Sequence, residues 1–307
     1  MKKIEVLGLQ TIPQIKQGDN LAEIIVDSSA GEIGGLEDKD IIVLTSKIVS
    51  KALGLTKKLS DVKPSKKALT ISRKTGKDSR WVQMIFDAGH KILAIIPIKG
   101  LVKQHIMNVS EDHDTGEELC EHEQAVLITL SKEGRIHTCD AGIDGSNHPV
   151  GIVSFLPADP DEAAARIRQK TQQLTGKTVA VILADTEMIP FGTMDFAVGS
   201  AGIEPRTKQF ARPDNFGIPK FGGIDLTAYE LCSASALVFG QTNAGIPVAI
   251  IRGYDYQLSE DENIANTIWS QAGSADLFRA VKETVRATAY AFGARYRLML
   301  KIASWLA

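Results

Sequence analysis

Val179-Ala-Val-Ile-Leu-Ala-Asp185-Thr186 is an apolar run that ends in a carboxylate and a hydroxyl. A short, continuous apolar run is typical of a strand that is buried on both faces within a sheet. We expect this strand to end at Ala184, so that Asp185 and Thr186 leave the carboxyl end of a sheet strand. Metal and phosphate sites of open α/β sheets lie at that edge. The alternative is that the pair caps a following helix.

The segments on either side of this run alternate between strand-like and helix-like patterns, which predicts an α/β (α+β) fold. The junction Asp159-Pro160 predicts a helix start, because aspartate is a good N-cap and proline fits the first helical position. Ser-Lys-Glu-Gly at 131–134 predicts a hairpin turn. The predicted strands are 3–9, 40–45, 152–156, 179–184 and 248–252, with a hairpin of 124–130 and 135–139; the predicted helices are 21–28, 79–88, one from Pro160, and 227–239.

The composition favours a globular protein that acts on small molecules. A chain of 307 residues with 44% hydrophobic residues can bury a sizeable core, and its length suggests about two domains. A net charge of -2 gives no field that would gather nucleic acid. Three cysteines without a CxxC pair indicate a reducing compartment. Because the N-terminal apolar run is too short for a signal peptide and no run approaches a membrane span, we expect a cytoplasmic protein.

Two further segments invite a functional interpretation that we do not favour. Residues 111–123 collect acidic side chains with His113, His122 and Cys120, and we expect a solvated acidic loop rather than a metal site. Gly176-Lys177-Thr178 resembles the end of a phosphate-binding loop, but it precedes a strand and Thr171 stands where the first glycine belongs. A glycine that ends a helix is the better interpretation.

Three polar clusters predict a phosphate and metal site. Asp140-Ala-Gly-Ile-Asp144-Gly-Ser-Asn147 packs oxygens into a tight turn that can face a hard cation, although such a turn is also a common structural loop. The loop 240–247, glycine-bounded and polar, allows backbone N–H groups to approach phosphate closely, or is an ordinary connection. Lys47 and Lys51 are four residues apart, so a helical turn would aim both ammonium groups at one polyphosphate; separate surface lysines are the alternative.

Taken together, these segments resemble the coenzyme F420:L-glutamate ligase family over residues 4–254. The resemblance rests on IPQIKQGD at 12–19, TSKIVSKA at 45–52, DAGIDGSN at 140–147, ADT at 184–186 and LVFGQTNAGIPVAIIRGY at 237–254. It implies a two-lobed mixed sheet-and-helix fold, a homodimer, and a GTP-dependent reaction that attaches glutamate to a small-molecule carboxylate acceptor through an acyl phosphate. It also implies two divalent cations, Mg²⁺ or Mn²⁺, and in many members a monovalent cation such as K⁺.

Residue roles follow from the matched motifs. The resemblance assigns Asp144 and Asp185 to one metal and to catalysis, and Thr186 with Gln241 to the second metal. The residues assigned to the guanine nucleotide are Pro13, Gln14, Ile15, Lys16, Ser46, Lys47, Lys51, Asn147, Gly240, Gln241, Thr242, Asn243, Ala244, Gly245, Ile246 and Pro247.

The chain departs from the family after Thr186. Members have a run with two arginines there, whereas this chain has Glu187-Met-Ile-Pro-Phe-Gly192. We therefore expect a different acceptor pocket, with a folate-type or other glutamate acceptor as an alternative to the deazaflavin and Arg206, Lys208 or Arg212 as candidate replacement cations. A further alternative is a catalytically inactive nucleotide-binding paralogue.

The C-terminal tail also lies outside the resemblance. We divide the chain into a ligase-like region at 1–257 and a helical extension at 258–307. Apolar residues on one face of the extension predict packing on the ligase body or across a dimer, with an interfacial membrane helix as the alternative.

Overall fold

The computed structural model describes residues 3–104, 124–132, 134–189, 192–240 and 242–269, together with a few isolated positions of the tail. Its strands are β1 (Glu5–Gly8), β2 (Ile41–Thr45), β3 (Thr56–Lys58), β4 (Lys91–Ile96), β5 (Val126–Leu130), β6 (Ile136–His137), β7 (Ile152–Ser154), β8 (Ala180–Ile189), β9 (Gly192–Ala201) and β10 (Val248–Arg252). Its helices are α1 (Leu21–Ile33), α2 (Ser46–Ala52), α3 (Lys66–Thr75), α4 (Ser79–Asp87), α5 (Ile98–Lys103), α7 (Pro160–Thr175) and α8 (Thr227–Phe239), with short helical turns η1 (Leu59–Asp61), η2 (Asp140–Gly142) and η3 (Ala265–Trp269).

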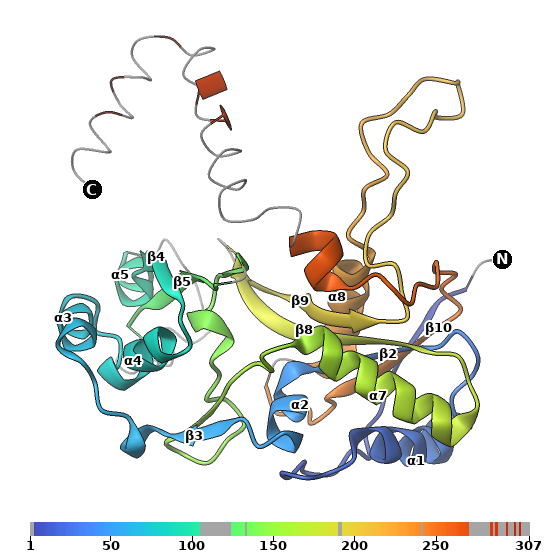
Figure 1. Ribbon diagram of the computed structural model, residues 1–307, viewed down its shortest axis with the longest axis horizontal. Helices are drawn as coiled ribbons and strands as arrows, with labels where there is room; N and C mark the ends of the chain where they lie inside the picture. The colour runs from blue at the N-terminus through green and yellow to red at the C-terminus, as the bar shows by residue number, and fades with distance from the viewer. Residues whose placement is uncertain are drawn as a thin grey trace.

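A five-stranded sheet forms the larger lobe, in the order β1-β10-β2-β8-β9. Its central strands β2 and β8 are parallel, and their partners on either side are antiparallel. Because β2 and β8 are buried on both faces, their side chains alternate between two cores. Helices α1 and α7 pack together over one face, and α8 covers the other (Figure 1).

The smaller lobe is built from the chain between α2 and α7. It contains the three-stranded sheet β4-β5-β6, the pair β3-β7 and the helices α3, α4 and α5. Its own core gathers Val82, Met84, Ile85 and Leu127 around the buried side of α4. Figure 1 shows this lobe beside one end of the large sheet. The structure therefore confirms the predicted mixed α/β architecture.

Several local predictions are confirmed. Asp159 accepts a hydrogen bond from the backbone N–H of Glu162 at 2.9 Å, which caps α7. Gly176 ends that helix in the left-handed conformation, with φ of 69°. Strands β5 and β6 form the predicted antiparallel hairpin.

The predicted end of the central strand at Ala184 is wrong. Strand β8 continues to Ile189, because β9 pairs with it antiparallel along its length. The parallel neighbour β2 does stop opposite Ala184, where Thr45 is its last residue. Asp185 and Thr186 thus lie inside a strand, on the part that extends beyond its parallel neighbour. They neither follow a strand nor cap a helix.

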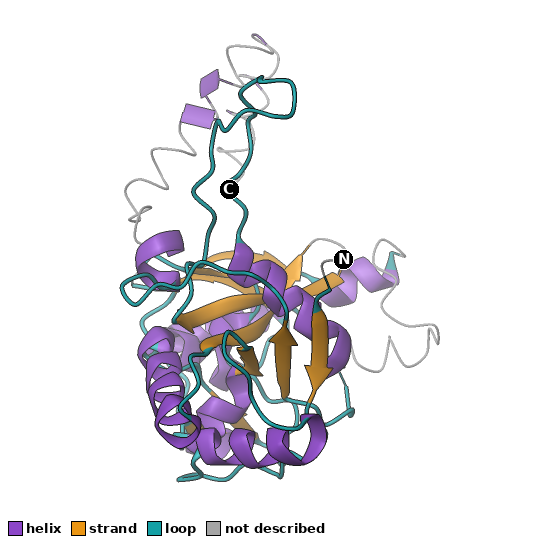
Figure 2. Ribbon diagram, turned by 90° about the vertical axis from the view of Figure 1, so that its right-hand side faces the viewer, coloured by secondary structure: helices purple, strands orange, loops and turns teal. Residues whose placement is uncertain are grey.

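An arm of two extended loop segments, residues 206–225, rises from the large lobe (Figure 2). Cross-arm hydrogen bonds join the backbones of Thr207 and Asp225 at 2.9 Å and of Gln209 and Gly223 at 2.7 Å. The rings of Phe210 and Phe221 meet edge to face, with centroids 5.4 Å apart. The arm therefore presents aromatic side chains away from the body.

The start of the tail packs onto the large lobe. Tyr256 and Ile264 are buried in the core beneath α8, and η3 follows directly. Most of the predicted helical extension lies outside the described residues, so the domain boundary at 257 stays a prediction. In the part of the chain that the structure describes, no helix has the length and apolarity needed to cross a bilayer.

Candidate functional site

A pocket of about 520 Å³ lies where the predicted clusters meet. Its walls come from the segment after β1, the junction of β2 and α2, the loop after η2, the extended part of β8 with β9, and the loop after α8. The predicted site residues that line it are Pro13, Gln14, Ile15, Ser46, Lys47, Lys51, Asp144, Asn147, Asp185, Thr186, Gly240, Thr242, Asn243, Gly245, Ile246 and Pro247. Lys16 and Ala244 are not in this lining, and Gln241 lies outside the described residues.

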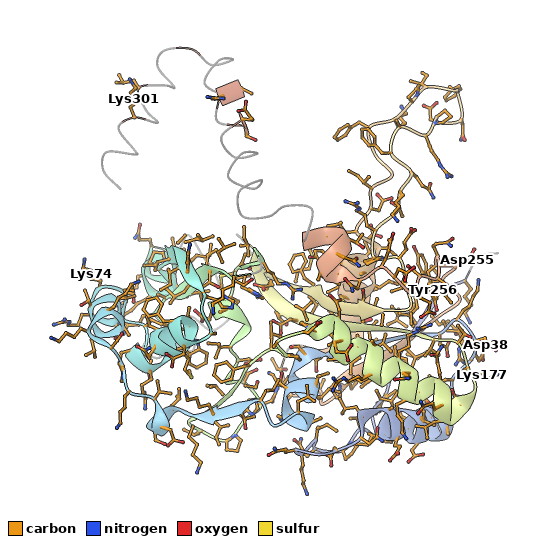
Figure 3. The ribbon with its side chains drawn as sticks, viewed as in Figure 1. Asp38, Lys74, Lys177, Asp255, Tyr256 and Lys301 are labelled. Carbon is orange, nitrogen blue, oxygen red and sulfur yellow. The ribbon has the colours of Figure 1, made fainter. Side chains whose placement is uncertain are left out.

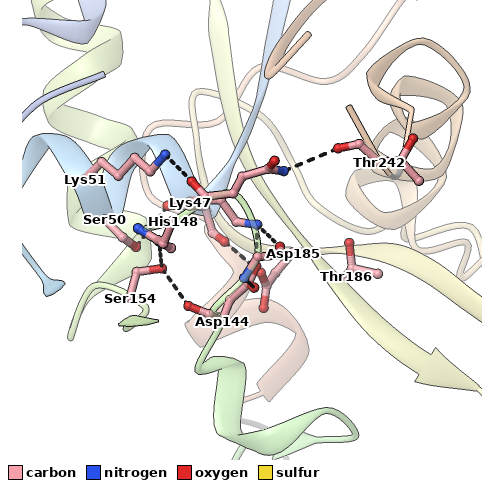
Figure 4. Close-up of polar contacts among 12 residues, drawn as sticks. Lys47, Ser50, Lys51, Asp144, His148, Ser154, Asp185, Thr186 and Thr242 are labelled. Atoms are coloured by element: carbon pink, nitrogen blue, oxygen red, sulfur yellow. Dashed lines mark hydrogen bonds and ion pairs between the residues drawn. The ribbon is translucent and has the colours of Figure 1, made fainter. Parts of the chain in front are cut away.

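Helix α2 directs its two lysines to the same loop, as the spacing predicted. The Nζ atom of Lys47 lies 2.6 Å from Oδ2 of Asp144 and also donates to Ser146. Lys51 donates to the backbone oxygen of Asn147 at 2.8 Å, and the Asn147 amide reaches the backbone oxygen of Thr242 at 3.4 Å (Figure 4). Burial, and then the charge of Lys47, lowers the pKa of Lys51. Two close ammonium groups are suited to bind a polyphosphate.

Asp185 also lines the pocket and accepts a hydrogen bond from the hydroxyl of Ser46, the first residue of α2, at 2.7 Å. Burial, together with the nearby carboxylates of Glu187, Asp144 and Asp195, raises the pKa of Asp185 to about 8, although the Ser46 hydrogen bond lowers it. A divalent cation would stabilise the ionised form of such a carboxyl group. The partly buried carboxylate and its acidic neighbours therefore fit a hard cation.

The donor set also fits Mg²⁺ or Mn²⁺. These ions prefer oxygen ligands, and Mg²⁺ is commonly held by one or two carboxylates together with phosphate oxygens and water. Asp144, Asp185 and the Thr186 hydroxyl supply such oxygens to the same pocket. Across the described ranges, no three His, Cys, Asp or Glu side chains are gathered as a self-sufficient metal site.

Asp195 is a site residue that the sequence did not indicate. It lies on β9 directly opposite Thr186, lines the pocket and is only 3% exposed. Its Oδ1 accepts a hydrogen bond from the Thr186 hydroxyl at 2.7 Å. This contact fixes the direction of the Thr186 hydroxyl proton, so that the oxygen lone pairs remain available to a ligand. No local pattern predicted β9, and without its register the proximity of Asp195 was hidden.

Other predicted features lie away from the pocket. Lys177 pairs with Asp38 at 3.7 Å on the surface of the large lobe, which agrees with a helix-ending glycine at 176 and not with a phosphate loop (Figure 3). Asp140 turns away from the pocket and pairs with the buried Lys77 at 2.6 Å. The acidic loop, with His113, His122 and Cys120, lies outside the described residues.

The cations expected to replace the missing arginines do not line the pocket. Lys208 pairs with Glu204 at 2.8 Å and with Glu262, and Arg212 lies on the arm. Arg206 is likewise absent from the lining. Within the described residues, the cationic side chains that line the pocket are those of Lys47 and Lys51.

Comparisons with known proteins identify the family of this chain. The family described as F420-0:Gamma-glutamyl ligase matches residues 10–253. The coenzyme F420:L-glutamate ligase of Methanothermobacter thermautotrophicus is 34% identical over 257 residues, which cover 82% of this chain and 90% of the relative. The enzymes of the same name from Methanosarcina mazei and Methanocaldococcus jannaschii are each 32% identical, over 85% and 92% of this chain and 91% and 97% of their own lengths. With this coverage, and with its matched motifs gathered around one pocket, the chain belongs to the F420-0:gamma-glutamyl ligase family.

Proposed function

We propose that the protein is a GTP-dependent and metal-dependent ligase that joins L-glutamate, or a similar amino acid, to an acceptor carboxylate through an amide bond. One observation carries the proposal. Lys47, Asp144 and Asp185 come from three distant segments and line one pocket large enough for a nucleotide. Two lysines and two acidic groups in one pocket are suited to bind a metal–polyphosphate complex.

In the proposed reaction, an oxygen of the acceptor carboxylate attacks the γ-phosphorus of GTP. The bond from that phosphorus to the bridging oxygen breaks, and GDP leaves. The glutamate amine then attacks the acyl carbon of the acyl phosphate, inorganic phosphate leaves, and the amine gives up a proton. Positioning and charge neutralisation carry both steps, and no nucleophilic side chain is needed.

The chain's own residues have distinct parts in this proposal. Lys47 and Lys51 hold phosphate oxygens from α2, and the loop 240–247 closes over the nucleotide. Asp144 and Asp185 would hold one divalent cation, and Thr186 with Gln241 the second. When bound, these cations neutralise charge on the phosphoryl group during its transfer. K⁺ as an additional cation stays a prediction from the resemblance.

The acceptor is the part of the proposal in which this chain differs from its relatives. The relatives are named for coenzyme F420, a deazaflavin, which makes the precursor of that coenzyme one candidate acceptor. The described part of the pocket near β8 and β9 presents Met188, Thr193 and Asp195 and no arginine. A phosphodiester-bearing acceptor gains from a nearby cation. This lining favours a second candidate, a glutamate acceptor of the folate type, over the deazaflavin precursor.

The arm supports the proposal that the protein is a homodimer. Phe216 and Phe221 are 89% and 92% exposed, and Ile218 is also exposed at the arm's tip. Exposed aromatic side chains gathered on one projecting segment are typical of an interaction surface. Association through the arm would bury these rings against a second copy.

The experiment that tests the proposal measures GDP release from GTP with Mn²⁺, with and without glutamate and each candidate acceptor. Release that requires both co-substrates, with an amide product detected by mass spectrometry, supports the ligase. Tighter binding of ATP than of GTP in calorimetry would reject the guanine assignment. Nucleotide binding without turnover under every acceptor would favour a catalytically inactive paralogue.

A further inference from the structure

Glu187 joins the two lobes next to the pocket. It lies on β8 two residues after Asp185, so both carboxylates leave the same face of the strand. Its side chain is buried, at 8% exposure, and contacts the end of β6 in the smaller lobe. Oε2 accepts hydrogen bonds from the backbone N–H of Thr138 at 2.6 Å and of Cys139 at 2.9 Å, and from the Thr138 hydroxyl at 2.8 Å. Oε1 lies 3.1 Å from Nδ1 of His137.

The segment that Glu187 holds leads directly into the loop that carries Asp144. Within its own lobe this loop is fixed by the ion pair of Asp140 with Lys77 and by the backbone pairing of Asp144 with Ser154. Those contacts set the shape of the loop, and they leave its position relative to β8 open. Glu187 supplies a contact across the lobe boundary at the beginning of the loop.

Other polar contacts from the large lobe to this loop come from Lys47 and Lys51 and from the backbone oxygen of Thr242, which accepts a hydrogen bond from the Asn147 amide at 3.4 Å; these groups all belong to the proposed nucleotide site. Lys47 reaches Asp144, and Lys51 reaches Asn147. A polyphosphate that binds both lysines would compete for these ammonium groups. The groups that contact Glu187 are not among those that would bind the polyphosphate. These contacts can therefore persist when the nucleotide is bound, which is when the lobes must stay aligned.

We propose that Glu187 is a positioning residue that anchors the loop of Asp144 onto β8, so that Asp144 and Asp185 reach the same bound cation from two lobes. The inference rests on the proposed metal–nucleotide site and adds a residue to it. Metal binding depends steeply on the placement of its ligands, and the groups that orient those ligands commonly affect affinity by about tenfold to a hundredfold.

The test uses the full chain and two independent measurements on Glu187→Ala. Hydrogen exchange should accelerate about tenfold or more at the amides of Thr138 and Cys139, which lose a charged acceptor. Exchange of the Asp144 amide should not change, because it donates to Ser154 within the smaller lobe at 3.1 Å. Calorimetry with GDP should show Mn²⁺ affinity lowered about tenfold or more, while GDP affinity without metal changes less than about threefold.

Two matched variants separate positioning from general destabilisation. Glu187→Gln keeps an oxygen that can accept from both amides, so it should retain Mn²⁺ affinity within about threefold. Asp161→Ala removes a buried carboxylate that accepts from the backbone N–H groups of Ser200, Ile264 and Ala265 at 2.7 to 3.0 Å, all within the large lobe. It should lower the unfolding temperature and leave Mn²⁺ affinity unchanged.

Three results would overturn the inference: unchanged exchange at Thr138 and Cys139 in Glu187→Ala, unchanged Mn²⁺ affinity despite faster exchange, or an equal loss of affinity in Asp161→Ala. A wild-type protein that binds GDP but no Mn²⁺ would instead reject the proposed metal function. In that case the exchange measurement alone still decides whether Glu187 holds the lobes together.

Discussion

Metal binding by this pocket should depend on pH through Asp185. Burial raises the pKa of this carboxyl group to about 8, so it carries a proton through neutral pH when no metal is present. A cation must displace that proton. With a pKa of about 8, only about one tenth of the Asp185 side chains are ionised at pH 7 and about one hundredth at pH 6. The affinity for Mn²⁺ should therefore rise about tenfold per pH unit up to about pH 8 and then level off.

The same pKa determines how the stability of the metal-free protein changes with pH. The folded-state value lies above the ordinary aspartate value of 3.8, so folding favours the protonated form. The contribution of Asp185 to stability is fully present below about pH 4 and is lost as the pH rises through about 8. Mn²⁺ should therefore raise the unfolding temperature more at pH 8 than at pH 6.

The assay is calorimetry of Mn²⁺ binding in the presence of GDP between pH 6 and 9, in two buffers that differ in ionisation enthalpy. Near pH 7, binding to the wild type should release close to one proton from the protein. The terminal phosphate of the nucleotide titrates near pH 6, so the Mn²⁺ affinities measured above pH 7 are the ones that report on Asp185. Asp185→Asn should bind Mn²⁺ more weakly and lose the pH slope. A flat affinity from pH 7 to 8, or the same slope in Asp185→Asn, would refute the reasoning.

Three further predictions concern turnover, assembly and the acceptor. Asp144→Ala should lower turnover at least about a hundredfold, because it removes a proposed metal ligand and the partner of Lys47. Asp255→Ala removes an exposed carboxylate paired with Lys39 and should retain activity; equal losses would reject the metal assignment. Phe216→Asp combined with Phe221→Asp should yield monomers in sedimentation while GTP binding persists; an unchanged oligomer would remove the arm from the interface. In parallel assays with GTP, Mn²⁺ and glutamate, a folate acceptor should be glutamylated more efficiently than the deazaflavin precursor; efficient use of the deazaflavin alone would contradict this expectation.

The central strands and the capped helix were predictable because their signals are local. Residues 41–44 and 179–184 are apolar without interruption, and Asp159-Pro160 combines two independent helix-start preferences. Lys47 and Lys51 converge because α2 begins directly after β2, so a spacing of four residues sets their common direction. These features could be predicted because each is determined by residues that are close together in the sequence.

The remaining parts depend on pairing between segments. Strand β9 contains Gly192, Gly199 and several small residues, a composition with weak strand propensity, and it is ordered by its ladder with β8. That ladder carries β8 past Ala184 and brings Asp195 beside Thr186. The arm lacks a local signal as well, since it is a pair of extended segments held by cross-arm hydrogen bonds.

The extension of β8 also explains how one strand contacts three different parts of the molecule. Side chains alternate along a strand, so Asp185 and Glu187 face one side and Thr186 the other. On the first side, Asp185 accepts a hydrogen bond from the Ser46 hydroxyl, and Glu187 accepts one from the backbone N–H of Thr138 at the end of β6. On the second side, the Thr186 hydroxyl donates a hydrogen bond to Asp195. A shift of one residue in the pairing of β8 would exchange these sides and remove all three contacts together. The register with β9 thus fixes the positions of the proposed metal ligands and of the lobe contact at once, which makes β9 part of the site although only a few of its side chains reach the pocket.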